Sequence, residues 1–150
     1  MLCALMLDKT LEVMMKIRSY SELVHFQTFD ERFEYLKLSG GVGRSTFGFD
    51  RYINQQFYAS YEWQEVRQYV IYRDEGCDLG ILGYEIHSEL LIHHMNPMTV
   101  DDVIQKKAWI LDPEFLITTT HKTHNNIHFG AKSSFPKVVI NRTPRDTNLW

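Results

Sequence analysis

The placement of histidine constrains the fold of this chain more than any other feature of its sequence. Of the seven histidines, only His25 lies in the first half, and the other six fall between His87 and His128. Imidazole is the commonest metal ligand among side chains. Because residues that share one ion must meet in space, this crowding restricts which elements can pack together.

Two histidine motifs in this region lie on predicted elements of different kinds. His93 and His94 end a β-rich run, whereas His124 and His128 lie four residues apart on a short predicted helix. Side chains with this helical spacing project from one face and can converge on one ion. A strand-borne histidine facing the helix therefore predicts a three-imidazole metal site with positions open for water and substrate. A fourth histidine beside the site, not itself a ligand, is placed to accept a proton from water near neutral pH.

The remaining histidines are expected to play ordinary roles. A lone histidine is more often a surface or core residue than a ligand, and a His-x-x-x-His spacing alone is weak evidence for a metal. We therefore expect His25, His87 and His121 to lie outside the site. His121, one helical turn before His124, is nevertheless within reach of a substrate phosphate.

The hydrophobic pattern predicts an α+β protein in which helices come first and strands later. Apolar residues recur at three- and four-residue intervals in the first part, and β-rich runs follow. We expect helices over residues 20–38, 50–67, 100–110 and 121–128, a glycine-rich turn over 39–43, and strands over 69–72, 84–86, 90–93, 115–119 and 138–140. These elements define an N-terminal extension (1–19), a helical part (20–68) and a module with a basic tail (69–150) in one compact domain.

Length and composition agree with one soluble domain. The 150 residues are 44% hydrophobic and 23% charged, which excludes a wholly disordered or fibrous protein. Cys3 and Cys77 lack the CxxC spacing of a four-cysteine zinc site and fit a reducing compartment. No apolar run is long enough to span a bilayer, so we expect no membrane association and a cytoplasmic location. We also expect the natural start at Met15 rather than Met1, with the preceding residues weakly ordered.

The formal net charge of −3 argues at face value against a nucleic-acid partner. The average conceals a gradient, since residues 74–119 hold nine acids and two bases, whereas residues 120–150 hold one acid and five bases. The basic segment begins where the histidine helix begins. The charge distribution is therefore compatible with a nucleic-acid partner.

Three segments around the histidines resemble a known nuclease motif. They are Leu91-Ile92-His93-His94-Met95-Asn96-Pro97, Asp112-Pro113-Glu114-Phe115-Leu116-Ile117 and Thr123-His124-Asn125-Asn126-Ile127-His128-Phe129-Gly130. Together they resemble the ββα-metal (His-Me finger) motif of HNH endonucleases, and the chain from about residue 20 onward is most similar to the small HNH proteins encoded by bacteriophages. The resemblance implies a metal-dependent hydrolase of DNA phosphodiester bonds, in which a helical part precedes the HNH module.

The same resemblance implies a role for each histidine of the two motifs. His94 becomes the general base that removes a proton from water. His93, His124 and His128 become the ligands of one divalent metal ion, which is Mg²⁺, Mn²⁺, Ni²⁺ or Zn²⁺.

The sequence departs from the family pattern at two places. Phe115 stands where the family has the asparagine that ties the two strands and the loop together, and either Asn96 or Asn125 is available to compensate. Thr120 and Thr123 occupy positions where many relatives carry cysteines of a structural zinc site, so no such zinc is expected.

DNA is the partner that the resemblance implies. Arg73, Lys122, Asn125 and Lys132 are candidates for binding its backbone, and the acidic stretch 74–114 is expected to face away from the duplex. Phage packaging proteins are a further implied partner. Two other functions stay open: a non-catalytic DNA-binding or phage assembly module with a structural metal, and a metal-dependent hydrolase of a small molecule. The second lacks an HExxH motif and the usual carboxylate ligands.

Overall fold

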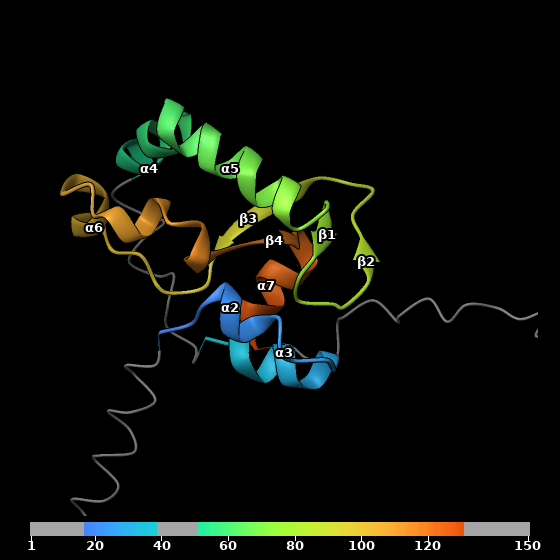
Figure 1. The fold of residues 1–150 in the computed structure, drawn as a ribbon. Coiled ribbons are helices and arrows are strands. Elements are labelled where there is room, and N and C mark those ends of the chain that lie inside the picture. The colour runs from blue at the N-terminus through green and yellow to red at the C-terminus, as the bar shows by residue number, and fades with distance from the viewer. Residues whose placement is uncertain (1–16, 39–50, 131–150) are drawn as a thin grey trace, which may run out of the picture.

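The structure of the chain is a computed structural model that describes residues 17–38 and 51–130 (Figure 1). The proposed start at Met15, the turn over 39–43, the strand over 138–140 and Lys132 lie outside the described residues. Within those residues, no helix has both the length and the apolar character needed to cross a membrane.

Helices α2 to α5 come first among the described elements, and short strands and further helices follow. The helices are α2 (Tyr20–Leu23), α3 (Phe29–Leu36), α4 (Arg51–Ala59), α5 (Tyr61–Arg73), α6 (Val100–Ile104) and α7 (His121–Phe129), with the 3₁₀ turns η1 (Ala108–Leu111) and η2 (Pro113–Phe115). The strands are β1 (Cys77–Asp78), β2 (Tyr84–Glu85), β3 (Leu90–His94) and β4 (Leu116–Thr120). They form two antiparallel pairs, β1–β2 and β3–β4. The predicted α+β class is therefore confirmed.

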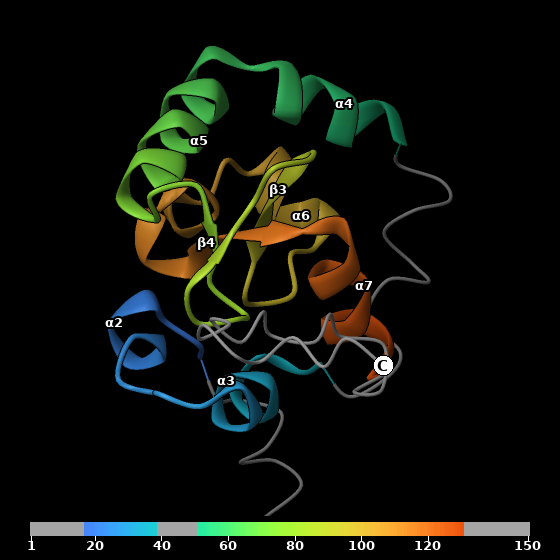
Figure 2. The same cartoon turned by 90° about the vertical axis from the view of Figure 1, so that its right-hand side faces the viewer.

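The β3–β4 pair separates two layers of helices. Helices α4 and α5 lie on one side of it and α7 on the other, with α2 and α3 beyond α7 (Figures 1 and 2). His93 pairs with Ile117 and His94 with Leu116. Because paired residues share a face and successive residues alternate, His93 and His94 point to opposite layers.

Each face of the pair has its own apolar cluster. On the α7 face, Ile117 packs with Ile127 of α7 and Leu36 of α3. On the α5 face, Leu116 packs with Trp63 and Val70. The two clusters fix the sheet between α5 and α7 and so set the direction of every side chain on β3.

The outer edge of β4 is held by carboxylates rather than by a full third strand. Leu79 N donates to Thr118 O at 3.0 Å, Thr118 N donates to Asp74 Oδ2 at 2.7 Å, and Thr120 N donates to Asp78 Oδ2 at 2.8 Å. Asp74 and Asp78 are both buried. Two acids of the stretch 74–114 are therefore structural groups that satisfy a strand edge.

The prediction of a strand over residues 69–72 is wrong, because these residues form the last turns of α5. The helix begins at Ser60, whose hydroxyl caps Trp63 N, and it buries Trp63 and Val70 two turns apart. This helical spacing of buried groups outweighs the β-propensity of the Tyr-Val-Ile-Tyr run. The predicted boundary between residues 68 and 69 falls inside the helix, so the helical part continues to Arg73.

The helix expected over residues 100–110 is interrupted. Helix α6 ends at Ile104, Lys106 adopts a left-handed conformation with φ of 49°, and the 3₁₀ turn η1 follows. Lys107 Nζ bonds to Asp102 Oδ1 at 2.6 Å, which closes this turn back onto α6. Strand β1 was not predicted, and the helix expected over residues 50–67 is divided at Ser60 into α4 and the longer α5. The other described helices and strands lie within their predicted ranges or differ from them by a few residues.

Candidate metal centre

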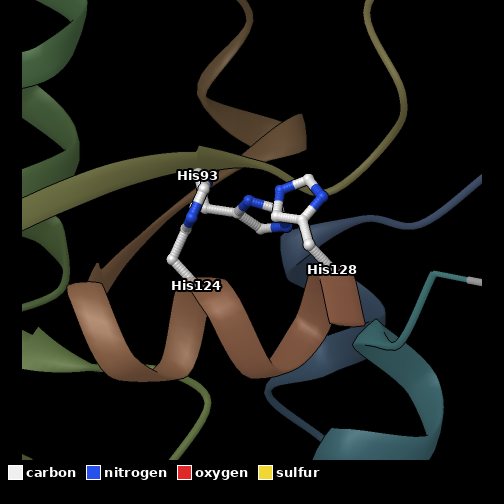
Figure 3. Close-up of side chains that lie close together, drawn as sticks. All are labelled: His93, His124 and His128. Carbon is white, nitrogen blue, oxygen red and sulfur yellow. The ribbon is translucent and has the colours of Figure 1, made fainter. Parts of the chain in front are cut away.

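Three histidine side chains converge between β3 and α7. His93 reaches down from the strand, and His124 and His128 rise from the helix (Figure 3). Their ring centroids are 5.1 Å (His93–His124), 5.2 Å (His93–His128) and 4.5 Å (His124–His128) apart. One nitrogen from each ring lies within 4.8 Å of the other two, close enough for the three residues to hold a metal ion.

Helix α7 presents its two histidines through well-formed ends and a buried face. Thr120 caps the N-terminus by accepting from Thr123 N at 3.1 Å, and Gly130 ends the helix in the left-handed conformation, with φ of 70°. Thr123 and Ile127 are buried. The helix is therefore fixed in rotation, and its histidine face is aimed at the sheet.

The nitrogen atoms of the cluster suit a cation. Nε2 of His93 and Nδ1 of His124 are buried and have no hydrogen-bond partner among the described residues. Burial, followed by the neighbouring histidines and Arg18, holds the pKa of His93 well below its usual value. Burial and the adjacent His128 lower the pKa of His124 to about 4. Neutral imidazoles with unused lone pairs are the form that binds metals, so the residues fit a divalent ion.

His94 does not join this cluster. Its ring stacks on Trp63 of α5, with centroids 5.3 Å apart and planes at 16°, and also contacts Phe57 and Trp109. His94 Nε2 lies 2.9 Å from Ile110 O, and because a carbonyl can only accept, Nε2 carries the proton. Burial lowers the pKa of His94 to about 4, although the Ile110 bond raises it. The ring is therefore neutral, with the lone pair on Nδ1.

Arg73 is committed to the fold rather than open to DNA. Its guanidinium donates to Asp74 Oδ1 at 2.8 Å, to Pro113 O at 2.7 Å and to Leu116 O at 2.7 Å. It also lies 3.7 Å over the Tyr20 ring. These contacts tie α5 to the residues that lead into β4, so the expected phosphate contact gives way to a structural role.

Replacement of Arg73 by methionine should therefore lower stability rather than DNA affinity. Hydrogen bonds from a charged donor contribute about 1.5–3 kcal/mol each, not additively, so we expect a loss of at least about 2 kcal/mol in the free energy of unfolding. Urea denaturation measures this loss, with Arg67→Met on the same helix as the control. Unchanged stability combined with weaker DNA binding would return Arg73 to the substrate site.

Two other predicted DNA contacts fall within the described residues, and both lie on the exposed side of α7. Lys122 and Asn125 are exposed, and Asn125 Nδ2 lies 3.4 Å from His121 Nδ1. The His121 ring lies 6.5 Å from that of His124, outside the three-residue cluster. His25 and His87 are exposed in the connections after α2 and β2.

Neither candidate asparagine braces the loop between β3 and β4. Backbone and ring contacts do so instead: Met95 N donates to Phe115 O at 3.0 Å, and His94 bonds to Ile110. Asn96 instead holds Arg18, accepting from its N at 2.8 Å and donating to its O at 2.8 Å. No sequence motif marks Arg18, which is a single arginine between Ile17 and Ser19.

Comparison of the chain with protein-family models, with curated proteins and with solved structures found no match. The function is therefore inferred from the residues and their arrangement.

Proposed function

We propose that the chain is a metal-dependent HNH endonuclease that hydrolyses phosphodiester bonds in DNA. The observation that supports this most directly is the convergence of His93 with His124 and His128. Three protein ligands leave positions for water and substrate, as in catalytic rather than structural sites. The succession of two antiparallel strands and a helix, β3, β4 and α7, agrees with the ββα order of the family that the sequence resembles.

His93, His124 and His128 would hold one divalent metal ion. When bound, such an ion neutralises charge on the phosphate and on the departing 3′ oxygen. Imidazole nitrogen suits zinc and nickel, whereas magnesium prefers oxygen ligands. Among the four ions that the resemblance implies, the all-nitrogen set therefore favours Zn²⁺ and Ni²⁺.

His94 is proposed as the general base. Its Nε2 proton is held by the Ile110 carbonyl, which leaves Nδ1 to take a proton from the attacking water. Because His94 and the cluster face opposite layers, the phosphodiester must lie across the end of β3 to meet both. Lys122 and Asn125, exposed on α7, are proposed to contact the DNA backbone, together with Lys132.

A non-catalytic DNA-binding or phage assembly module with a structural metal is the second candidate. One observation favours it: the His94 ring packs against Trp63, Phe57 and Trp109 as a core side chain does. In this case the three-histidine site would stabilise the fold, and His94 would only brace the loop.

Cleavage of supercoiled plasmid distinguishes the two candidates. The protein is stripped with EDTA and reloaded in turn with Zn²⁺, Ni²⁺, Mn²⁺ or Mg²⁺. We expect nicking with at least one ion, and a loss of about 10²–10⁴-fold in His94→Gln at unchanged metal content and melting temperature. The control is His87→Gln, which changes an exposed histidine.

Two outcomes would count against the nuclease. Undiminished nicking by folded His94→Gln removes the general base. A metal-loaded wild-type protein that binds DNA but cleaves none with any of the four ions supports the structural-metal module instead.

A further inference from the structure

Within residues 17–38 and 51–130, the Arg18 guanidinium has no carboxylate partner, and its charge acts on His93 of the histidine cluster. Arg18 Nε donates to Tyr35 O at 2.7 Å, and Nη2 donates to Lys37 O at 3.0 Å. Among the described residues, Arg18 makes no ion pair with a carboxylate, and Nη1 makes no hydrogen bond. The side chain is only partly buried, so a solute can reach it.

Short chains of hydrogen bonds connect Arg18 to the two segments that carry the cluster. Its guanidinium bonds to the carbonyl of Lys37, and the next residue, Leu38, donates from N to Ile127 O at 3.0 Å, directly before His128. The Arg18 main chain is clamped by the Asn96 side chain, three residues after His93. The end of α3 and the segment before α2 accordingly pass beside His128 in Figure 3.

The electrostatics agree with this proximity. The charge of Arg18 is among the causes that lower the pKa of His93, after burial and the His124, His128 and His94 rings. A fixed cation next to a cation site opposes metal binding. An anion that contacts both centres removes this conflict.

A structural role at the end of α3 explains only part of the environment of Arg18. Arginine near a helix C-terminus commonly bonds to the last carbonyls, and this accounts for Nε and Nη2 at the end of α3. It does not account for a guanidinium whose charge acts on His93 and which no carboxylate of the described segments neutralises. Two carbonyl bonds fix the plane of the fork, which is the preorganisation that favours phosphate oxygens.

We propose that Arg18 binds a phosphate group that lies next to the histidine cluster, and that Asn96 is the positioning residue that sets the location of Arg18. The inference rests on the proposed function, since the phosphate is that of the DNA substrate. It makes the segment before α2 part of the substrate site.

Binding of thymidine 3′,5′-bisphosphate to the Zn²⁺-loaded protein tests the proposal without any cleavage step. Calorimetric titration is expected to show binding about tenfold or more weaker for Arg18→Gln, because one charge-assisted phosphate contact is lost. Arg18→Lys keeps the charge and should recover part of the affinity. The control Arg67→Gln removes the same charge from α5 and should bind as the wild type does.

The Zn²⁺ affinity separates this role from a structural one. It should be unchanged or tighter in Arg18→Gln, because a neighbouring positive charge is removed. If Arg18→Gln fails to fold, Asn96→Ala provides the same test. This change removes the two hydrogen bonds that hold the main chain of Arg18 but leaves the charge of Arg18 in place. Nucleotide binding should again weaken. Folded Arg18 or Asn96 variants that bind the nucleotide as Arg67→Gln does would overturn the proposal.

The outcome is distinguishable from failure of the nuclease proposal. Arg18-dependent nucleotide binding by a protein that never cleaves DNA would leave the phosphate site standing and remove the enzyme. Cleavage by the wild type together with unaltered nucleotide binding by Arg18→Gln would remove only the role of Arg18.

Discussion

Replacement of His93 by alanine is expected to abolish the metal-dependent rise in the temperature of unfolding. An ion that binds only the folded protein stabilises it by about 2.7 kcal/mol when its concentration is 100 times its dissociation constant. Three ligands hold the ion, and His93 is both the only one on the strand and the most deeply buried. Its loss leaves the two nitrogens of one helix, too few to retain the ion at that concentration.

The experiment compares each protein with itself. Thermal unfolding is followed by circular dichroism in EDTA and again with Zn²⁺, because His93→Ala also creates a cavity that lowers stability in both conditions. The difference between the two scans isolates the metal. His124→Ala and His128→Ala should behave in the same way, whereas exposed His25→Ala should keep the full rise. If Zn²⁺ raised the unfolding temperature of His93→Ala as much as that of the wild type, the ion would have to bind elsewhere.

The histidine cluster was predictable because it depends on local periodicity. Residues four apart lie on the same face of a helix, so His124 and His128 must do so. Thr120 and Gly130 mark the ends of that helix. A β-rich run before Asn96-Pro97 similarly marks the strand that carries His93. These signals lie within a few residues of the groups that they place, so the sequence alone brought the three ligands together.

The environment of His94 was not predictable in this way. Alternation along β3 does separate it from His93, but only the packing of α5 decides what covers its face. Tyr69 to Tyr72 have the residue types of a strand, whereas the helix is specified by Trp63 and Val70 two turns apart, against Leu116. A pattern of burial against distant residues cannot be obtained from propensity.

The location of the acidic side chains was the second feature that could not be predicted from composition. The acids of residues 74–114 are consistent with a solvated surface, yet Asp74 and Asp78 are buried against the edge of β4. Their partners are backbone N–H groups some forty residues away, which carry no signature in the sequence. The same holds for Arg18, whose partners are two main-chain carbonyls and the Asn96 side chain.

The Asp78 carboxylate is expected to be the polar group on which the position of α7 most depends. Its Oδ1 accepts from Gly80 N at 2.9 Å and its Oδ2 from Thr120 N at 2.8 Å. Burial raises the pKa of Asp78, and hydrogen bonds from Thr123, Thr120 and Gly80 oppose that rise. Only glycine fits at position 80, because a Cβ there would lie 2.5 Å from Thr123 Cγ2. The carboxylate therefore joins the loop after β1 to the first turn of α7.

Asp78→Asn should lower the free energy of unfolding by about 3 kcal/mol. The amide places an NH₂ group against one of two buried N–H donors, so one hydrogen bond to a charged acceptor is lost and its donor is left unsatisfied. Because Thr120 caps the helix that carries His124 and His128, the affinity for Zn²⁺ should fall as well. Urea unfolding and metal titration measure the two effects.

The control is Asp101→Asn, which makes the same change at an exposed position of α6. Its free energy of unfolding should stay within about 0.5 kcal/mol of the wild-type value. If Asp78→Asn proved equally mild, the edge of β4 would have to be satisfied by other groups, and α7 would owe its position to its apolar face alone.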